Sequence, residues 1–528
     1  MFQILHIFHK DGRRHWFETL ASLVLLGAYA HSVLHPWSGS SRTMYANMGR
    51  YFWMNELLAP ALVLFWFFLI LRIVQGETLV GDRQWWVTKP YVWWKLLLSK
   101  CLFVFAAISL PLFFVQLYLL LVNGFPVLPN LLGVVRLQVG LAVSLVLIAF
   151  LLGSLTRNLA QAILTTVAFF VAAYSGIRFV VDEYGDGGAM TGPGFVPGSI
   201  EGPFWLLCAA GLLLWQYAFR RTWQSRGVLC AGAVLAVLVA NLPGPTNYVE
   251  STYPLVTGEK VPAKIEMNLR TADKEDGNED RWPEFAPVIS LRIPLKISGL
   301  AQGSMLMVQG MKLTLTAPDG AVWTNGWRYS YAQAWPGGEF ISDLTYGMKR
   351  QDFEKWKNLT ARAHIELAMS RYVEDQPREI VLPAGSFSDA QLGICRTDPY
   401  NPSFLECLKP FHGPAYMATF DGRESSCRSE NGRRFFRETV WHSWSGPYDL
   451  DFIEPGLSPI TVYSVYFQEA KQNIQHELQF CEGAKIRFAY PKLGEHSRVE
   501  LEIPSISVKA LSKGLFSLNA ISIGLRPK

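Results

Sequence analysis

The most chemically distinctive stretch of the chain lies at residues 77–100, where four tryptophans stand among several cations. Tryptophan favours the membrane–water interface because its ring system is apolar and its indole N–H seeks a hydrogen-bond partner. Pro90 disfavours a helical conformation at Lys89 and fits the first turn of a new helix. We therefore expect a short interfacial helix that ends near Thr88 and a second helix that starts at Pro90 and enters a membrane. A membrane-anchored surface helix is the simplest interpretation of this stretch.

Cysteines of the second half form another set with defined chemistry, namely Cys395, Cys407, Cys427 and Cys481. In an oxidising compartment, four thiols make two disulfides with three alternative connectivities. Sequential pairing closes the shorter loops and is slightly favoured. A zinc site is the rival interpretation, although close C-x-x-C spacing is missing.

Patterns that would support catalysis are missing from the sequence. The histidines of the second half are scattered without H-E-x-x-H or other metal-ligand spacing, and no G-x-S-x-G motif occurs. The chain also lacks a G-x-x-x-x-G-K-[ST] loop, whose backbone N–H groups and lysine would hold the phosphates of ATP. We assign no catalytic, cofactor-binding or metal-binding residue and expect no cofactor on this chain. Any ATP would bind a partner.

These residues must be positioned by structural elements, and composition divides those elements into two regions. Charged residues make up 17% of the chain, against about a quarter in soluble domains. Residues 1–245 hold 16 basic and 9 acidic residues, a net charge of +7, whereas residues 246–528 hold 32 and 34, a net charge of −2. This excludes a uniform soluble domain, a disordered chain and a collagen-like fibre. The overall charge of +5, without a basic cluster interleaved with aromatics, argues against nucleic acid as a partner.

Seven stretches of the first region are apolar enough to suggest membrane-spanning helices, which need about 20 such residues to cross a bilayer. They lie at 17–35, 57–75, 96–122, 131–153, 159–180, 203–219 and 227–243. The last is the least certain. The first also resembles a signal peptide, with Ala28-Tyr29-Ala30 as a cleavage site, but its apolar run continues to Leu34 and a retained helix is preferred.

Basic residues in the loops predict the orientation. With the N-terminus in the cytoplasm, twelve loop cations lie inside and three outside, as the positive-inside rule requires. The expected location is the cell (inner) membrane, crossed several times, with the C-terminal region periplasmic or extracellular. If residues 227–243 do not cross, that region is cytoplasmic instead.

The stretch after the second apolar segment resembles a family motif. It reads Trp86-Val87-Thr88-Lys89-Pro90, with Glu77 upstream and Lys95 and Lys100 downstream. Permease subunits of type-2 ATP-binding-cassette (ABC) exporters carry a similar W-x-(T/S)-(R/K)-P stretch after their second span. The resemblance covers about residues 1–225.

The resemblance implies a six-helix permease whose loop docks onto a separate ABC ATPase subunit, with ATP on that partner. It also implies a homodimer or a pair with a similar permease, embedded among membrane lipids. The implied ATPase-coupling surface comprises Glu77, Asp82, Arg83, Trp85, Trp86, Thr88, Lys89 and Pro90. The seventh span and the long C-terminal region depart from the family pattern and leave the transported substrate open.

Alternating apolar and polar residues predict strands in the second region. Val288–Leu300 alternates over its whole length, and similar patterns occur at Met305–Leu315, Ala363–Met369, Ile460–Phe467 and Val499–Val508. Pro294 predicts an edge position or a bulge, and Pro-Asp-Gly at 318–320 predicts a turn. Helices are conceivable at Glu354–Leu367, where the strand assignment competes, and at Ala470–Phe480.

The expected architecture is therefore an α-helical polytopic membrane domain followed by a β-rich, sandwich-like extracytoplasmic region. The permease-like six-span domain covers 1–226, the seventh span and exit linker 227–245, and the β-rich region 246–528. Length permits two subdomains in the last, about 246–385 and 386–528.

Three hypotheses about function follow. The leading one is an ABC-type permease subunit, acting in export and driven by a separate ATPase. The second is a non-transporting membrane sensor or assembly factor that has a permease-like membrane half. The third is a membrane enzyme acting on envelope or lipid-linked substrates, which would require a compact acid/base or metal site in the outer region.

Overall fold

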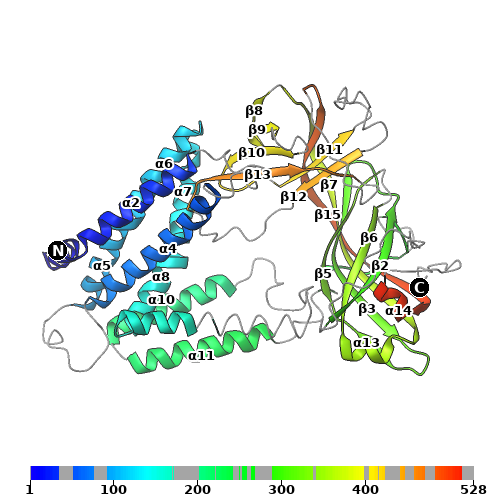
Figure 1. Ribbon diagram of the computed structural model, residues 1–528, viewed down its shortest axis with the longest axis horizontal. Helices are drawn as coiled ribbons and strands as arrows, with labels where there is room; N and C mark the ends of the chain where they lie inside the picture. Colours follow the sequence, from blue (N-terminus) through cyan, green and yellow to red (C-terminus); the bar gives the residue numbers. More distant parts are fainter. Residues whose placement is uncertain are drawn as a thin grey trace.

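The computed structural model has a helical N-terminal region and a β-rich C-terminal region, placed side by side along its long axis (Figure 1). It describes residues 2–34, 51–76, 92–168, 171, 201–219, 222–241, 249, 252–257, 263–267, 288–336, 340–383, 385–397, 404–413, 415–421, 440–445, 457–469 and 482–513. The expectation of helices followed by strands is confirmed at this level.

The helical region is a bundle whose successive long helices run in alternate directions (Figure 1). Its helices are α1 (Phe2–Arg14), α2 (Trp16–Val33), α4 (Tyr51–Gln75), α5 (Trp93–Val104), α6 (Leu110–Val122), α7 (Val127–Leu141), α8 (Leu147–Leu155), α10 (Glu201–Phe219) and α11 (Thr222–Asn241). A shorter apolar helix covers Leu159–Ala168. We call the end of the bundle that carries α1 the α1 end, and the opposite end, next to the strands, the sheet end.

Three helices among the described residues are long and apolar enough to cross a membrane: Leu57–Gln75, Trp93–Val122 and Val127–Leu155. The bundle also has helices in the other four expected places, but they do not meet that criterion of length and hydropathy within the described residues. The association with a membrane is thus supported by three helices, and a total of seven crossings stays a prediction.

Two of these long helices contain a π-helical turn near their middle, η3 (Phe105–Ser109) and η4 (Ala142–Val146). Pro111 follows η3 and cannot donate a backbone hydrogen bond to Ala107, and its ring would crowd that carbonyl, so a widened turn relieves the contact. In η4, Ser144 Oγ donates to the carbonyl oxygen of Gly140 at 2.7 Å, which competes with the regular backbone bond. Each long helix is therefore divided at a local irregularity.

The β-rich region contains three sheets. The largest has the order β14-β12-β11-β15-β7-β3-β4, with β5 on β3; the others are β1-β2-β6 and β13-β10-β9-β8. Their bounds are β1 (Lys264–Met267), β2 (Val288–Ser298), β3 (Ser304–Thr316), β4 (Val322–Thr324), β5 (Arg328–Ala334), β6 (Phe340–Lys349), β7 (Thr360–Val381), β8 (Ser386–Asp389), β9 (Gly393–Thr397), β10 (Phe404–Pro410), β11 (Tyr416–Asp421), β12 (Val440–Ser445), β13 (Ile460–Tyr466), β14 (Gln468–Glu469) and β15 (Lys485–Ser507). Two short helices, α13 (Arg350–Trp356) and α14 (Val508–Lys513), accompany them.

Two long strands organise this region. β7 and β15 pair antiparallel from Thr360 opposite Ser507 to Val381 opposite Lys485. One apolar core packs the sheet of β2 and β6 against one part of this pair and β3, and a second packs β9, β10 and β13 against its other part and β11. The division near residue 385 stays a prediction, because β15 from the later segment pairs along the whole of β7 from the earlier one.

The strand predictions can be compared residue by residue. Leu291, Ile293, Leu295 and Ile297 are buried in β2 as the alternation required. Pro294 lies within β2 and pairs with Asp343 of β6, and the described pairing with β1 ends next to it, at Leu295. Among the described residues, β6 is thus the one strand paired at Pro294, and an edge position stays a prediction.

The two remaining local predictions have different outcomes. The Pro-Asp-Gly turn is confirmed: Gly320 N donates to the Ala317 carbonyl at 3.0 Å, and Ala321 N donates to Asp319 Oδ1 at 2.9 Å. A single helix over 354–367 is wrong, because α13 ends at Trp356 and β7 begins at Thr360. The alternating side chains of β7 are buried by neighbouring strands, which overrides local helix propensity. The helix expected at 470–480 lies outside the described residues.

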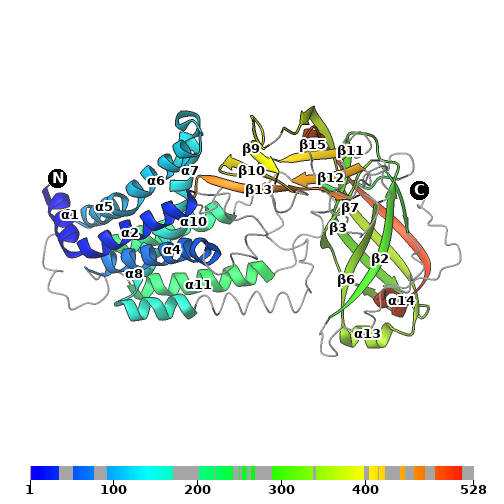
Figure 2. The same cartoon turned by 45° about the horizontal axis from the view of Figure 1, so that its top comes forward.

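The β-rich region touches the sheet end of the bundle at one defined place (Figure 2). Gln138 Nε2 donates to Gln116 Oε1 at 2.8 Å, and Gln116 Nε2 donates to the Leu457 carbonyl at 3.0 Å. The next residue, Ser458, shares a side-chain hydrogen bond with Tyr29 of α2. Apolar residues of α6, α7, β10 and β13 pack around these bonds. Three helices thus hold the segment that leads into β13.

Candidate functional site

The expected ATPase-coupling residues, from Glu77 to Pro90, lie outside the residues that the structure describes. Both flanks of that segment are described. On one side α4 ends at Gln75 and Gly76 follows, and on the other the described part of the next helix begins at Trp93. Trp94 carries the Lys95 ammonium 5.5 Å from its ring centroid, a cation–π contact at the start of α5. The site can therefore be built from the contacts that fix its two flanks.

A buried ion pair joins α1 to α5 beside the second flank. Lys100 Nζ donates to both carboxylate oxygens of Asp11, at 2.9 and 2.8 Å. The two side chains are 2% and 4% exposed. Two charges tolerate such burial only when their geometry is good, and removing either partner leaves an uncompensated charge. The pair therefore ties α1 firmly to α5, about two turns past the start of that helix.

The sequence placed Lys100 among the loop cations, and the structure buries it instead. A usable signal was present on α1, where Asp11 follows Ile7 by one helical turn and shares its buried face. A carboxylate on an apolar helix face requires a buried cationic or hydrogen-bonding partner. Lys100 supplies it.

α1 also forms hydrogen bonds on both sides of the 77–91 segment. Arg14 Nη1 donates to the carbonyl oxygen of Gly76 at 3.2 Å. At the other flank, Ser99 Oγ donates to the carbonyl oxygen of Ile4 at 3.1 Å. One short helix thus holds the residue that precedes the segment and the helix that follows it.

Side-chain bonds connect the first flank with other helices at the α1 end. Gln75 Nε2 donates to Thr156 Oγ1, just past the end of α8, at 2.8 Å. The guanidinium of Arg226, on α11, donates to the Leu155 carbonyl at 2.9 and 2.6 Å. Arg72 joins α4 to α2, because its Nη1 lies 2.8 Å from the Glu18 carboxylate. We call the contacts Asp11–Lys100, Arg14–Gly76 and Gln75–Thr156 the flank frame, because they fix both flanks of the 77–91 segment to the rest of the bundle.

One of the predicted disulfides is confirmed. Cys395 of β9 and Cys407 of β10 face each other across the two antiparallel strands and are bonded. Both cysteines are buried in the core beneath that sheet. Cys427 and Cys481 lie outside the described residues, so their sequential pairing stays a prediction.

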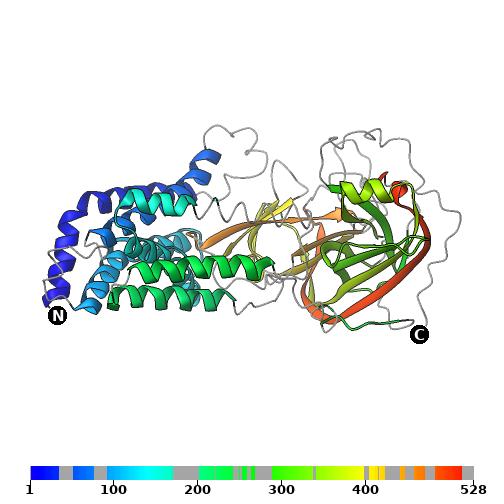
Figure 3. The ribbon, with the colours of Figure 1, turned by 90° about the horizontal axis from the view of Figure 1, so that it is seen from below.

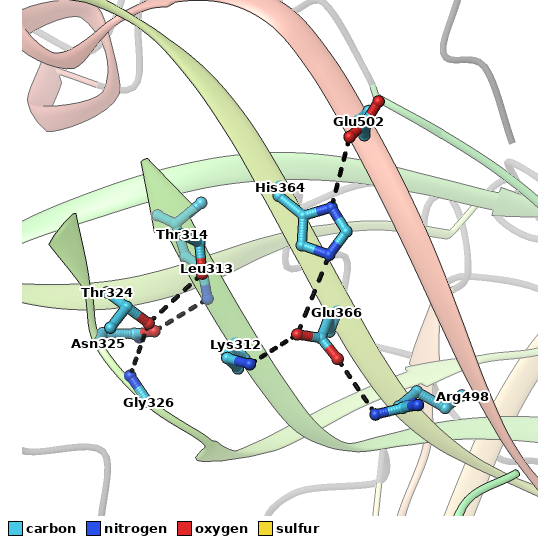
Figure 4. A network of polar contacts seen from close by, with 10 residues as sticks. All are labelled: Lys312, Leu313, Thr314, Thr324, Asn325, Gly326, His364, Glu366, Arg498 and Glu502. Atoms are coloured by element: carbon cyan, nitrogen blue, oxygen red, sulfur yellow. Dashed lines mark hydrogen bonds and ion pairs between the residues drawn. The ribbon is translucent and has the colours of Figure 1, made fainter. Parts of the chain in front are cut away.

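A charged network on the largest sheet was not found from the sequence (Figure 4). Glu366 of β7 is nearly buried and accepts from Lys312 Nζ at 2.7 Å and from Arg498 Nη1 at 3.3 Å. His364 lies between Glu366 and Glu502, at 4.0 and 3.8 Å. Two cations offset the one buried carboxylate, which makes the network a stable link between β3, β7 and β15.

The chain that enters the β-rich region is fastened beside this network. Backbone bonds of 2.8–2.9 Å join residues 254–256 to Arg498. Tyr253 donates to Gln309 Oε1, to which Ser370 Oγ also donates, at 2.6 Å. Ser370 Oγ in turn lies 2.8 Å from His496 Nδ1. Burial lowers the pKa of His496, which favours its neutral ring.

The serine–histidine contact resembles part of a nucleophilic site, but its geometry favours a structural role. Ser370 is fully buried, its hydroxyl is engaged by Gln309, and Tyr253 covers the His496 ring edge-on at 4.9 Å between centroids. A nucleophile needs access to its substrate. Within the described residues, no group of three or more His, Cys, Asp or Glu side chains is placed to hold a metal ion.

Comparisons of the chain with protein-family models, with curated proteins and with solved structures find no match.

Proposed function

We propose that this chain is the membrane-spanning permease subunit of an ABC-type exporter, driven by a separate ATPase subunit that docks on the 77–91 segment. The coupling surface comprises Glu77, Asp82, Arg83, Trp85, Trp86, Thr88, Lys89 and Pro90. ATP binds and is hydrolysed on the partner, and two permease chains, identical or similar, form the complex.

The flank frame is the observation that carries this proposal. A segment that receives force from a partner must be connected rigidly to the helices it moves, since slack at its ends would absorb the motion. Asp11–Lys100, Arg14–Gly76 and Gln75–Thr156 connect the two flanks to α1 and to the end of α8. Tryptophans and cations within the segment supply a surface suited to docking.

We further propose that the β-rich region is a sandwich-like domain outside the cytoplasm. Two apolar cores that each lie between sheets support the sandwich-like description. The Cys395–Cys407 disulfide supports an oxidising compartment, and the region meets the sheet end, opposite the flank frame. The N-terminus is then cytoplasmic.

The mechanism follows from these placements. Closure of the ATPase subunits around ATP displaces the 77–91 segment, and the flank frame transfers that displacement to α1, α4, α5 and α8. The helices then exchange between two packings. ATP biases this exchange because the ATPase subunits bind it more tightly when the helices have one of the two packings. The π-helical turns in two long helices provide places where such a change can occur without breaking the whole helix.

A pull-down with replacement of two surface residues tests the proposal. Mild detergent should retain a second chain that carries a G-x-x-x-x-G-K-[ST] loop, identified by mass spectrometry. Trp86→Ala with Lys89→Ala should lose that chain, whereas Lys355→Ala, an exposed cation of the β-rich region, should retain it. The proposal would be contradicted if no ATPase subunit is recovered and the double variant retains the same chains as the wild type.

A further inference from the structure

α1 lies across the α1 end of the bundle, roughly perpendicular to the long helices (Figure 3). One of its faces packs on α5 around Ser99, Lys100 and Phe103, and Ile7 and Asp11 are buried on that face. The opposite face is exposed. A helix that lies across the end of spanning helices runs along the membrane surface.

The exposed face of α1 carries cations without exposed acids. Its polar residues are His6, His9, Lys10, Arg13 and Arg14, all exposed. Asp11 is the only acidic residue of the helix, and Lys100 neutralises it beneath the surface. The face therefore carries the cationic side chains of Lys10, Arg13 and Arg14.

Exposed apolar residues of α2 and α5 indicate where the membrane boundary lies relative to α1. The stripe of exposed apolar side chains on α2 begins immediately after α1, with Trp16 and Phe17 at 63% and 65% exposure, and continues through Leu20 and Val24. On the neighbouring α5, Trp93 and Trp94 at the helix start are also exposed. Aromatic residues at the end of a lipid-facing stripe mark the boundary with the headgroups. α1 ends where that stripe begins, so its exposed face lies at headgroup depth.

We propose that the cationic face of α1 binds the anionic headgroups of glycerophospholipids in the cytoplasmic leaflet. Lys10, Arg13 and Arg14 contact the phosphates, while Phe2 at the start of α1 and Trp16 at the start of α2 insert among the headgroups. Bound lipid holds α1, and through Arg14 and Asp11 it steadies both flanks of the 77–91 segment. The inference rests on the membrane placement proposed above and does not require transport.

Hydrogen–deuterium exchange of the full chain in nanodiscs tests this binding. One set of discs contains phosphatidylcholine alone, and the other contains about a third phosphatidylglycerol. Each cation near an anionic surface strengthens binding about fivefold, so we expect amides of residues 2–14 to exchange at least fivefold more slowly in the anionic discs. Half-molar salt should remove most of the difference because it shortens the screening length.

Two variants separate lipid binding from folding. The triple variant Lys10→Gln/Arg13→Gln/Arg14→Gln should lose the lipid-dependent slowing, and Lys10→Gln/Arg13→Gln, which retains the Arg14–Gly76 bond, should lose most of it. A control with the same change in charge, Lys355→Gln/Lys492→Gln/Lys509→Gln on exposed positions of the β-rich region, should keep it. Unfolding midpoints in phosphatidylcholine discs should show that the variants are folded.

Equal exchange in the two kinds of disc overturns the inference and would favour an acidic protein surface as the occupant of this face. Equal slowing with inorganic phosphate in phosphatidylcholine discs would also overturn it, because free anion would then suffice. Failure of the chain to enter discs at all would instead contradict the membrane placement on which the inference rests.

Discussion

The two ends of the helical bundle are closed in different ways. At the α1 end, helices bind each other: Asp11 binds Lys100, Gln75 binds Thr156, and Arg226 binds the end of α8. At the sheet end, the β-rich region supplies the binding groups, because Gln116 and Tyr29 reach residues 457 and 458 of a segment far along the chain. Among the described residues, the first end is held by contacts between helices, and the second by contacts with another region.

This difference shows where motion can enter and leave the bundle. The contacts at the α1 end join α1, α4, α5, α8 and α11 beside the 77–91 segment, so a push there moves several helices together. At the sheet end, α2, α6 and α7 contact the segment before β13, so movement of those helices shifts the β-rich region. Under the proposed function, motion is therefore transmitted from the α1 end of the bundle to the β-rich region.

The largest expected effect lies at the α1 end. Asp11→Leu leaves the Lys100 ammonium buried without its partner, which costs about 3–5 kcal/mol. The double variant Asp11→Leu/Lys100→Met should recover most of that loss, because two apolar side chains can fill the same space. Thermal unfolding of the full chain in detergent measures both.

The exposed pair Asp352–Lys355 is the matched control for that measurement, and Lys355→Met should change stability by less than about 1 kcal/mol. Equal losses in Asp11→Leu and Lys355→Met would show that the α1 end is not held by its buried charges.

Removing the disulfide should give the next largest effect, confined to the β-rich region. The chain-entropy estimate for a 12-residue separation is about 3 kcal/mol. Cys395→Ala/Cys407→Ala should therefore lower the unfolding temperature of the β-rich region and hasten proteolysis there. Probes on the bundle that do not rely on tryptophan fluorescence should report an unchanged unfolding transition of the helices. A parallel loss in the bundle would mean that the two regions unfold as one unit.

The contact at the sheet end can be disturbed by one methyl group. A Cβ added at Gly133 of α7 would lie 2.2 Å from the Phe411 ring, so Gly133→Ala must displace that ring or the backbone. Overpacking of this kind costs about 1–3 kcal/mol. We expect faster hydrogen exchange at residues 457–469, with exchange at the α1 end unchanged.

Gly27→Ala on α2 is the control, because a Cβ there meets no atom within 4 Å and alanine favours helix. If Gly133→Ala leaves residues 457–469 as protected as Gly27→Ala does, the sheet-end contact does not hold the β-rich region.

The smallest expected effect is a pH dependence of the stability of the β-rich region. Burial lowers the folded-state pKa of His496 below its ordinary value of 6.5, so the unfolded chain binds the proton more readily. The stabilising contribution is complete above pH 6.5 and declines as the pH falls below it. Denaturant unfolding of the β-rich region between pH 7.5 and about 5 should show this decline, and His496→Gln should flatten it. His364→Gln, which keeps His496, should retain it; a slope that survives in His496→Gln contradicts this assignment.

Much of the coarse architecture could be predicted from the sequence, because it depends on local patterns. Apolar stretches predicted helices in the right places, and period-two alternation predicted β2, β3 and β13. The full lengths of β7 and β15 could not be predicted. Residues 374–379 of β7 are almost all polar, and they are extended because β15 pairs with them, although Gln376 has a left-handed φ of 49°.

The candidate site was predicted less completely. The motif at Trp86–Pro90 pointed to the segment, but the sequence pattern did not reveal the helix that holds its flanks. Asp11 and Lys100 are 89 residues apart, and a pairing at that distance depends on the packing of α1 against α5. Likewise, the bond from Gln116 to the Leu457 carbonyl could not be predicted, because the two residues are 341 positions apart in the sequence.

Site-specific photo-cross-linking in cells tests the central claim most directly. A photoreactive amino acid at position 86, within the proposed coupling surface, should capture a chain that carries an ATP-binding loop, whereas the same group at Val322, exposed on the β-rich region, should not. Capture should depend on Lys89 and persist in the Gly133→Ala variant. An ATPase subunit captured from position 322 and not from position 86 would contradict both the docking surface and the proposed orientation of the molecule.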